Sequence, residues 1–278
     1  MKTALNQKKI DYWRSRMEAG YEFMMEILHY PVCESHEKLV FIPDYAKKTG
    51  VKMFFSKKKR TPVSLPMFYL REGIIENLLC AVDKMNSRGW AIKVEDAFRT
   101  TQMQNPLNRN KEVLNSVIKT ILWETNGKIP EPEFVFRRLT VLIATIPKIG
   151  THMSGSAVDI SVISLKTGKE IDRGADYLEM NEKTFMDSPF VSLRARKNRQ
   201  TITQIMEESG FFAYPYEFWH YSSKDAYAQY LSKSGMPGIY GPVDLIDKSG
   251  AIKPIENPEK PLFPIEKIKE KINEFIKK

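Results

Sequence analysis

The stretch at residues 157–162 limits the fold of this chain more than any other, because apolar and polar side chains alternate in it. Branched apolar residues occupy every second position, namely Val158, Ile160 and Val162. Successive side chains of a strand point to opposite faces of a sheet, so the pattern predicts a strand that buries one face and presents Asp159 on the other. His152 precedes this strand by a turn rich in Gly and Ser, which is expected to fold back and bring the two side chains close together.

Apolar residues at three- and four-residue spacing predict helices on both sides of this strand. The expected helices cover 1–30, 70–88, 110–123, 193–209 and 265–278. Alternation predicts a second strand at 90–99, and the aromatic-rich segment after Pro215 is strand-like. Residues 31–68 are expected to be irregular, and 134–146 fits either a helix or a strand. This order of helices and strands predicts the α+β class.

Composition excludes several classes of protein. Cys33 and Cys80 are the only cysteines, which gives neither a disulfide framework nor a thiolate zinc site. No apolar run approaches the roughly 20 residues of a membrane span, and the first residues lack the pattern of a secretory signal. We therefore expect a cytoplasmic protein without a membrane partner. The net charge of +9 is spread along the chain, so basic clusters at 57–60 and 194–199 predict solvated surface, and nucleic acid is not an expected partner.

The two segments that contain His152 and His220 carry the candidate chemistry. A catalytic zinc ion uses three protein ligands and keeps one open position, and His152, Asp159 and His220 offer such a set. Glu217 lies three residues before His220 and is the candidate for proton transfer. These two residues share a face only on a helix, yet Pro215 and the neighbouring tyrosines argue against a helix. A bend near Glu217 is therefore predicted.

Ordinary structural roles stay open for the same residues. A histidine beside Gly and Ser is often a surface turn residue, and a buried aspartate often accepts backbone N–H groups. The aromatic residues around His220 are also typical of a plain core. Against this, two of only four histidines have a carboxylate within a few residues. Spacing alone leaves the metal site and the structural roles as alternatives.

Two motifs resemble those of a known enzyme family. The stretch HMSGSAVD at 152–159 resembles the H-x-x-G-x-A-x-D motif of the zinc D-alanyl-D-alanine peptidases, and EFWH at 217–220 resembles their E-x-W-H motif. The similarity covers roughly 66–230 and is greatest to the D-alanyl-D-alanine dipeptidases of the vancomycin-resistance type. It implies a small antiparallel sheet flanked by helices, which is the zinc D-Ala-D-Ala peptidase or Hedgehog-like fold.

The resemblance also implies a division of the chain and a set of site residues. The division is an N-terminal helical extension at 1–65 packed on the core, a zinc peptidase core at 66–232, and a Gly/Pro-rich extension at 233–278 with a short helix. The implied zinc ligands, one ion per chain, are His152, Asp159 and His220. The implied catalytic residues are Glu217 as base and Arg99, whose guanidinium fork suits a developing oxyanion. The candidate substrate contacts are Thr151, Ser154, Phe98 and Trp219.

We therefore predict a zinc metallopeptidase that hydrolyses a small D-Ala-D-Ala-type dipeptide. The same zinc site would serve a carboxypeptidase or endopeptidase acting on cell-wall peptides, although the lack of an export signal counts against it. A non-catalytic binding protein on this scaffold is a third hypothesis, and the complete set of ligands with Glu217 counts against it. Leu178 stands where the family commonly has an aspartate, so the exact dipeptide stays open, as do the oligomeric state and the physiological role.

Overall fold

The computed structural model describes residues 2–58 and 66–276. Residues 59–65, which include half of the basic cluster at 57–60 and the end of the expected N-terminal extension, lie outside the described part. Within that part, no helix combines the length and the hydropathy that a membrane span requires.

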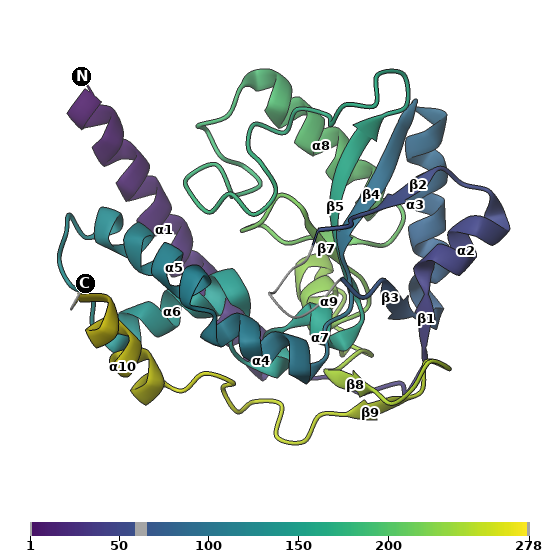
Figure 1. The fold of residues 1–278 in the computed structure, drawn as a ribbon. Coiled ribbons are helices and arrows are strands. Elements are labelled where there is room, and N and C mark those ends of the chain that lie inside the picture. Colours follow the sequence, from purple (N-terminus) through teal and green to yellow (C-terminus); the bar gives the residue numbers. More distant parts are fainter. Residues whose placement is uncertain (1, 59–65, 277–278) are drawn as a thin grey trace.

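A five-stranded sheet lies at the centre of the described structure, with its strands in the order β2-β4-β5-β7-β6 (Figure 1). These strands are β2 (Met53–Phe55), β4 (Trp90–Asp96), β5 (Ala157–Ser164), β7 (His220–Ser222) and β6 (Phe212–Ala213). The α+β class is confirmed. The expected antiparallel pairing joins β4, β5, β7 and β6, and the edge strand β2 pairs parallel to β4. Helix α3 (Ile75–Ser87) supplies the crossover that a parallel pair needs.

Helices α3 and α8 (Leu193–Glu207) cover one face of this sheet. The alternation at 157–162 is confirmed, because the three branched residues of β5 pack in the core beneath these helices. Helix α8 begins where the Ser192 side chain accepts a hydrogen bond from the backbone N–H of Ala195. The remaining elements beside this core are β1 (Leu39–Phe41), α2 (Ile42–Thr49), β3 (Tyr69–Arg71) and the 3-10 turn η1 (Glu72–Ile74). The expectation that 31–68 is irregular was therefore wrong for β1, α2 and β2.

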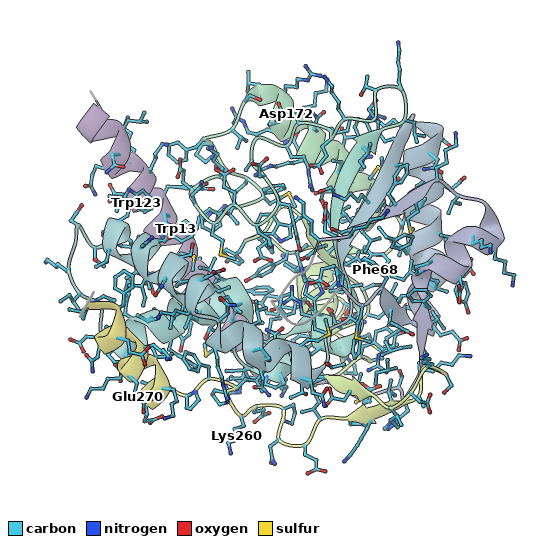
Figure 2. The ribbon with its side chains drawn as sticks, viewed as in Figure 1. Trp13, Phe68, Trp123, Asp172, Lys260 and Glu270 are labelled. Atoms are coloured by element: carbon cyan, nitrogen blue, oxygen red, sulfur yellow. The ribbon has the colours of Figure 1, made fainter. Side chains whose placement is uncertain are left out.

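A layer of helices packs around a second hydrophobic core, which is separate from the core between the sheet and helices α3 and α8. Its members are α1 (Lys2–His29), α4 (Thr101–Arg109), α5 (Lys111–Glu124), α6 (Pro132–Ile143), α9 (Ala226–Ser232) and α10 (Ile265–Ile276). Figure 2 shows Trp13 of α1 beside Trp123 of α5, with their rings edge to face at 6.4 Å. The ambiguous segment 134–146 is mostly helix, because Val135, Leu139 and Ile143 recur every four residues and are buried together.

Both flanks of the sequence contribute to these cores. Helix α1 packs on α5 and α6, β2 is a strand of the central sheet, and α10 packs on α6. A hairpin of β8 (Val243–Leu245) and β9 (Ile252–Pro254) precedes α10. The helices predicted at 1–30 and 265–278 are confirmed over their described residues. The three-part division at 65 and 232 stays a prediction.

Candidate active site

The register of the sheet places two of the expected metal ligands side by side. Asp159 on β5 lies directly opposite His220 on β7 and, on its other side, opposite Asp96 on β4. Residues that oppose each other in antiparallel strands have Cβ atoms about 4.5–5.5 Å apart. The predicted strand face that carries Asp159 is thus the face from which the site is built.

His152 reaches the same place from a four-residue helix, α7 (Thr151–Ser154), and not from the flexible turn that the sequence indicated. The helix ends at Gly155, whose φ of 64° is left-handed. A Cβ atom at Gly155 would stand 2.4 Å from Leu39 Cδ2. Glycine therefore allows the chain to turn sharply from α7 into β5, so that His152 returns over Asp159.

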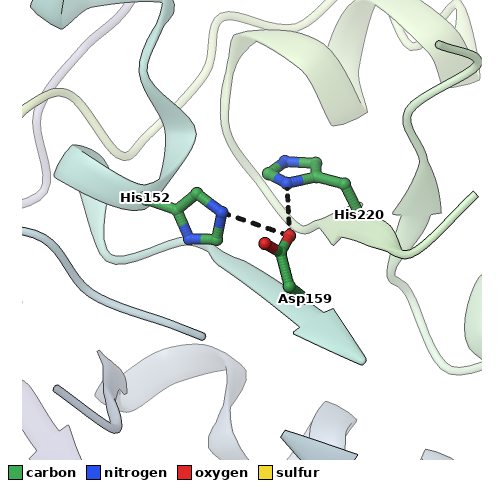
Figure 3. A group of neighbouring side chains, drawn as sticks. All are labelled: His152, Asp159 and His220. Atoms are coloured by element: carbon green, nitrogen blue, oxygen red, sulfur yellow. Dashed lines mark hydrogen bonds and ion pairs between the residues drawn. The ribbon is translucent and has the colours of Figure 1, made fainter. Parts of the chain in front are cut away.

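The three side chains converge on a single point (Figure 3). His152 Nε2 lies 3.2 Å and His220 Nδ1 lies 2.9 Å from the same oxygen of Asp159, Oδ1. Their ligand atoms all lie within 4.8 Å of one another, and all three residues are buried. This is the donor set of two imidazoles and one carboxylate that suits a catalytic zinc site.

The outward ring nitrogens of both histidines have partners of their own. His152 Nδ1 donates to the carbonyl of Ala97, and its other ring nitrogen, Nε2, faces Asp159. His220 Nε2 lies 2.8 Å from Thr151 Oγ1, which can accept its proton and leave a lone pair at Nδ1. A divalent ion held by these three groups would replace the two hydrogen bonds that join the rings to Asp159. The residues therefore fit a divalent metal, with second partners that orient each ring.

Burial and neighbouring charges together set the pKa values of the Asp159 and His220 side chains. Burial opposes ionisation of Asp159, yet His152 and His220 outweigh it and hold the pKa of the Asp159 carboxyl well below its usual range. Burial lowers the pKa of His220, and the neighbouring His152 and Arg99 add to that effect although Asp159 opposes it. The ionised carboxylate and the neutral imidazole are the forms that bind a metal.

Glu217 lies in a bend between β6 and β7, as predicted from the sequence. The bend is closed by hydrogen bonds from Tyr214 N to His220 O and from His220 N to Glu217 O. The segment after Pro215 is therefore a turn, and its expected strand begins only at His220. Burial and the negative charge of Asp159 raise the pKa of the Glu217 carboxyl well above its usual range, although Arg99 opposes them.

The ring of Phe218 anchors this bend between two buried guanidinium groups. Arg199 lies 4.1 Å and Arg173 lies 4.7 Å from the ring centroid. Arg199 also donates to the backbone carbonyls of Arg173, Phe185 and Lys183. The prediction of a solvated cluster at 194–199 was wrong for Arg199, which is 1% exposed.

The three expected ligands and Glu217 line a cavity, and Arg99 lines it as well. The guanidinium of Arg99 is fixed by a carboxylate and an amide. Its Nε and Nη2 atoms each lie 2.8 Å from Asp96 Oδ2, and Nη1 donates to Gln104 Oε1. Burial alone would lower the pKa of Arg99, but the charges of Asp96 and Asp159 raise it above its usual value. The guanidinium is therefore charged and held in one orientation.

The structure separates the four expected substrate contacts into two pairs. Thr151 and Trp219 line the cavity, whereas Phe98 and Ser154 are buried outside its wall. Phe98 lies two residues beyond the end of β4. Its side chain packs with Leu39 in a small hydrophobic core beside β8.

Sequence reasoning missed Tyr177, whose hydroxyl donates to Asp159 Oδ2 at 2.7 Å. Its ring also packs edge to face on Trp219, at 5.4 Å between centroids. Tyr177 lies in a loop without secondary structure, so no periodicity marks it. The only local signal is a single aromatic residue in the polar stretch RGADYLEM at 173–180.

Comparisons with known proteins identify the family of this chain. The Peptidase_M15 family model, described as D-ala-D-ala dipeptidase, matches residues 70–234. The D-alanyl-D-alanine dipeptidase of Enterococcus faecium is 26% identical over 154 residues, which cover 55% of this chain and 71% of that protein. The Escherichia coli K12 dipeptidase is 25% identical over 157 residues, covering 56% and 67%. The crystal structure of the vancomycin-resistance D,D-pentapeptidase VanY (E175A mutant) with Zn(II) aligns over 66% of this chain and 87% of its own, with 14% identity and a TM-score of 0.35.

Proposed function

The chain belongs to the Peptidase_M15 family of D-Ala-D-Ala dipeptidases, and from this premise we propose that it hydrolyses a free D-Ala-D-Ala-type dipeptide. At the family level it is a zinc metallopeptidase for D-Ala-D-Ala or peptidoglycan peptides. The observation that supports hydrolysis is the meeting of His152, Asp159 and His220 in one buried cluster, and the relatives named D-alanyl-D-alanine dipeptidase favour the free dipeptide. Glu217 and Arg99 line the same cavity.

The cluster defines where the metal would bind. His152 Nε2, His220 Nδ1 and one oxygen of Asp159 are the atoms that would hold the zinc ion. When bound, zinc supplies Lewis acidity that polarises a carbonyl and lowers the pKa of water. Tyr177 and Thr151 would keep the carboxylate and one imidazole in place through their hydrogen bonds.

The chain's own groups provide proton transfer and charge stabilisation. Glu217 would take one proton from the attacking water and pass it to the nitrogen of the leaving amine as the C–N bond breaks. Arg99, already oriented by Asp96, would stabilise the negative charge that develops on the carbonyl oxygen. Water adds its oxygen to the carbonyl carbon, so the products are two amino acids.

The test compares Glu217→Gln with a matched exposed carboxylate, Glu207→Gln, on α8. We expect Glu217→Gln to bind one zinc ion per chain by metal analysis and to lose roughly 10²–10⁴-fold in kcat on D-Ala-D-Ala. Glu207→Gln should keep both properties. Loss of zinc from Glu217→Gln would contradict the role of this residue as a proton carrier that is not a ligand.

A second assay separates the dipeptidase from a cell-wall peptidase with the same zinc site. The zinc-loaded protein is given free D-Ala-D-Ala and, separately, a pentapeptide that ends in D-Ala-D-Ala. We expect hydrolysis of the dipeptide only. Cleavage of the pentapeptide in preference to the dipeptide would favour the carboxypeptidase, and zinc binding without hydrolysis of either would reject the proposal.

A further inference from the structure

The segment 173–185, between β5 and α8, carries part of the active site although it contains no helix or strand. We call it the Tyr177 loop. Tyr177 and Leu178 line the cavity, and the Tyr177 hydroxyl donates to Asp159 Oδ2 at 2.7 Å. Because no helical or sheet pattern of backbone hydrogen bonds fixes this loop, its shape depends on contacts with other elements.

One side chain of α8 ties the two ends of the Tyr177 loop together. Arg199 Nε lies 2.7 Å from the carbonyl oxygen of Arg173, at the start of the loop. Arg199 Nη1 and Nη2 lie 2.6 and 2.9 Å from the carbonyl oxygens of Phe185 and Lys183, at its end. A guanidinium is planar and its N–H groups point in fixed directions, so Arg199 sets the distance between the two ends of the loop.

The same guanidinium reaches the bend that carries Glu217. The carbonyl of Thr184 lies between the two carbonyls at the end of the loop that bind Arg199, and it accepts from the backbone N–H of Phe218 at 3.1 Å. The ring of Phe218 also lies against the guanidinium, with 4.1 Å between its centroid and Arg199 Cζ. Phe218 follows Glu217 in the chain, so Arg199 supports the Tyr177 loop and the bend at once.

A charged side chain is a costly way to fill this part of the core. Arg199 is buried, and within the described structure its hydrogen bonds go to backbone carbonyls and not to a carboxylate. Burial and the charge of Arg173 lower the pKa of Arg199 to about 10, so the guanidinium is still charged at neutral pH. Apolar residues of similar volume often stabilise such a position as well or better. The geometry that the guanidinium imposes on its neighbours is what an apolar side chain would not supply.

We propose that Arg199 is a positioning residue for the reaction, which holds the Tyr177 loop and the Glu217 bend in a fixed arrangement. Arg199 is not among the described residues that line the cavity, so it acts through others. Through Tyr177 it keeps Asp159 oriented for the metal, and through Phe218 it keeps Glu217 in place. The effect on hydrolysis rests on the proposed function, whereas the effect on zinc affinity does not.

The first experiment measures zinc affinity by competition with a chelator for Arg199→Lys, Tyr177→Phe and the double variant. A lysine ammonium keeps the charge but cannot replace the planar fork that binds three carbonyls. Each single variant should hold zinc about tenfold more weakly, at the lower end of the roughly 10–100-fold expected for outer partners of metal ligands. The double variant should lose little more than one single variant, because both changes remove the same support. Wild-type affinity in Arg199→Lys, or additive losses in the double variant, would overturn the inference.

A pair of glycine variants tests the same link from the loop side. A Cβ atom at Gly174, where φ is 84°, would stand 2.5 Å from Val191 Cβ and 3.1 Å from Ala195 Cβ on α8, so Gly174→Ala pushes the start of the loop away from the helix. Gly168 has a similar φ of 68°, and a Cβ atom there would meet no described heavy atom within 4 Å. Gly174→Ala should weaken zinc binding as Arg199→Lys does, and Gly168→Ala should not. Equal affinities in the two glycine variants would contradict the proposal, including the case in which thermal unfolding shows that Arg199→Lys does not fold.

The last measurement is kcat on D-Ala-D-Ala with zinc at saturation. A displacement of about 1 Å caused by a remote mutation can cost about 10²-fold, so kcat of Arg199→Lys should fall at least about tenfold. Arg194→Lys, at an exposed position of the same helix, should keep the wild-type kcat. A purely structural Arg199 would lower the unfolding temperature and leave kcat of the folded, zinc-saturated protein unchanged, which would overturn the inference. If the wild-type protein hydrolyses no dipeptide, the proposed function fails, and the zinc affinities alone decide whether Arg199 is a positioning residue.

Discussion

Asp225 offers a direct test of how burial controls charge beside the active site. It caps α9 by accepting from Ala228 N at 2.9 Å, and it also accepts from the hydroxyls of Ser222 and Ser156. Burial raises the pKa of Asp225 from 3.8 to about 6, although these hydrogen bonds oppose the change. The ionised carboxylate is therefore less stable in the folded protein than in the unfolded chain.

The magnitude follows from this difference in pKa. Between pH 3.8 and about 6 the folded protein binds more protons at Asp225 than the unfolded chain does, so this contribution is full below pH 3.8 and is lost as the pH rises through 6. A shift of about 2.2 units corresponds to about 3 kcal/mol of the free energy of unfolding. About 1.4 kcal/mol of that loss develops between pH 5 and pH 8.

The perturbation is Asp225→Asn, which cannot ionise. The amide oxygen can still accept from Ala228 N, and the amide N–H groups can donate to Ser156 Oγ, which then donates to Thr151 O alone. The free energy of unfolding of both proteins is measured by urea denaturation at pH 5 and pH 8, with zinc in excess. The difference between variant and wild type should shift by about 1.4 kcal/mol in favour of the variant between these two pH values.

The control is Asp247→Asn. Asp247 is fully exposed, and hydrogen bonds from the Ser249 side chain and backbone lower its pKa, so it is ionised over the whole range. Its difference from wild type should be the same at both pH values. An equally constant difference for Asp225→Asn would refute the reasoning, because it would mean that Asp225 does not titrate above its ordinary pKa in the folded protein.

Three further predictions concern the metal cluster and its supports. Thr151→Val removes the partner of His220 Nε2, and competition with a chelator should show zinc held about 10–100-fold more weakly; unchanged affinity would speak against the orienting role. Arg99→Lys keeps the charge but loses the fork, so kcat should fall about 10²–10³-fold with zinc content unchanged, as steady-state kinetics and metal analysis can check. Gly155→Ala sets a Cβ against Leu39 at a left-handed position, and urea denaturation should show a loss of about 2–4 kcal/mol.

Elements with a strong local period were predictable from the sequence. Helices α3 and α5 each bury one continuous face, and the helical period of their apolar residues agrees with what is buried. Strand β5 buries both faces over residues 157–162, and its period of two separates the apolar face from the face that carries Asp159. The predicted bend at Glu217 also followed from local chemistry, since Pro215 and the tyrosines exclude a helix there. These features depend on neighbours in the chain, so propensity and spacing were enough.

Features that depend on distant partners were not predictable in this way. Strand β2 has three residues and no period, and it forms because β4 offers a parallel edge. Arg199 sits in a basic run, yet carbonyls from other segments draw it into the interior. Tyr177 reaches Asp159 from a loop that only tertiary packing places. The periodicity of a local window of sequence specifies none of these contacts.

The sequence by itself determined which ligand chemistry is present: two imidazoles and one carboxylate, with a second carboxylate three residues before His220. Tertiary structure alone decided that these groups meet. Asp159 and His220 are 61 residues apart, and they share hydrogen-bonding distance because the β5–β7 register sets them opposite each other. A slip of one residue would turn His220 to the other face of the sheet. Basicity and charge belong to individual side chains, whereas the distance between remote segments is set by the packing of the whole sheet.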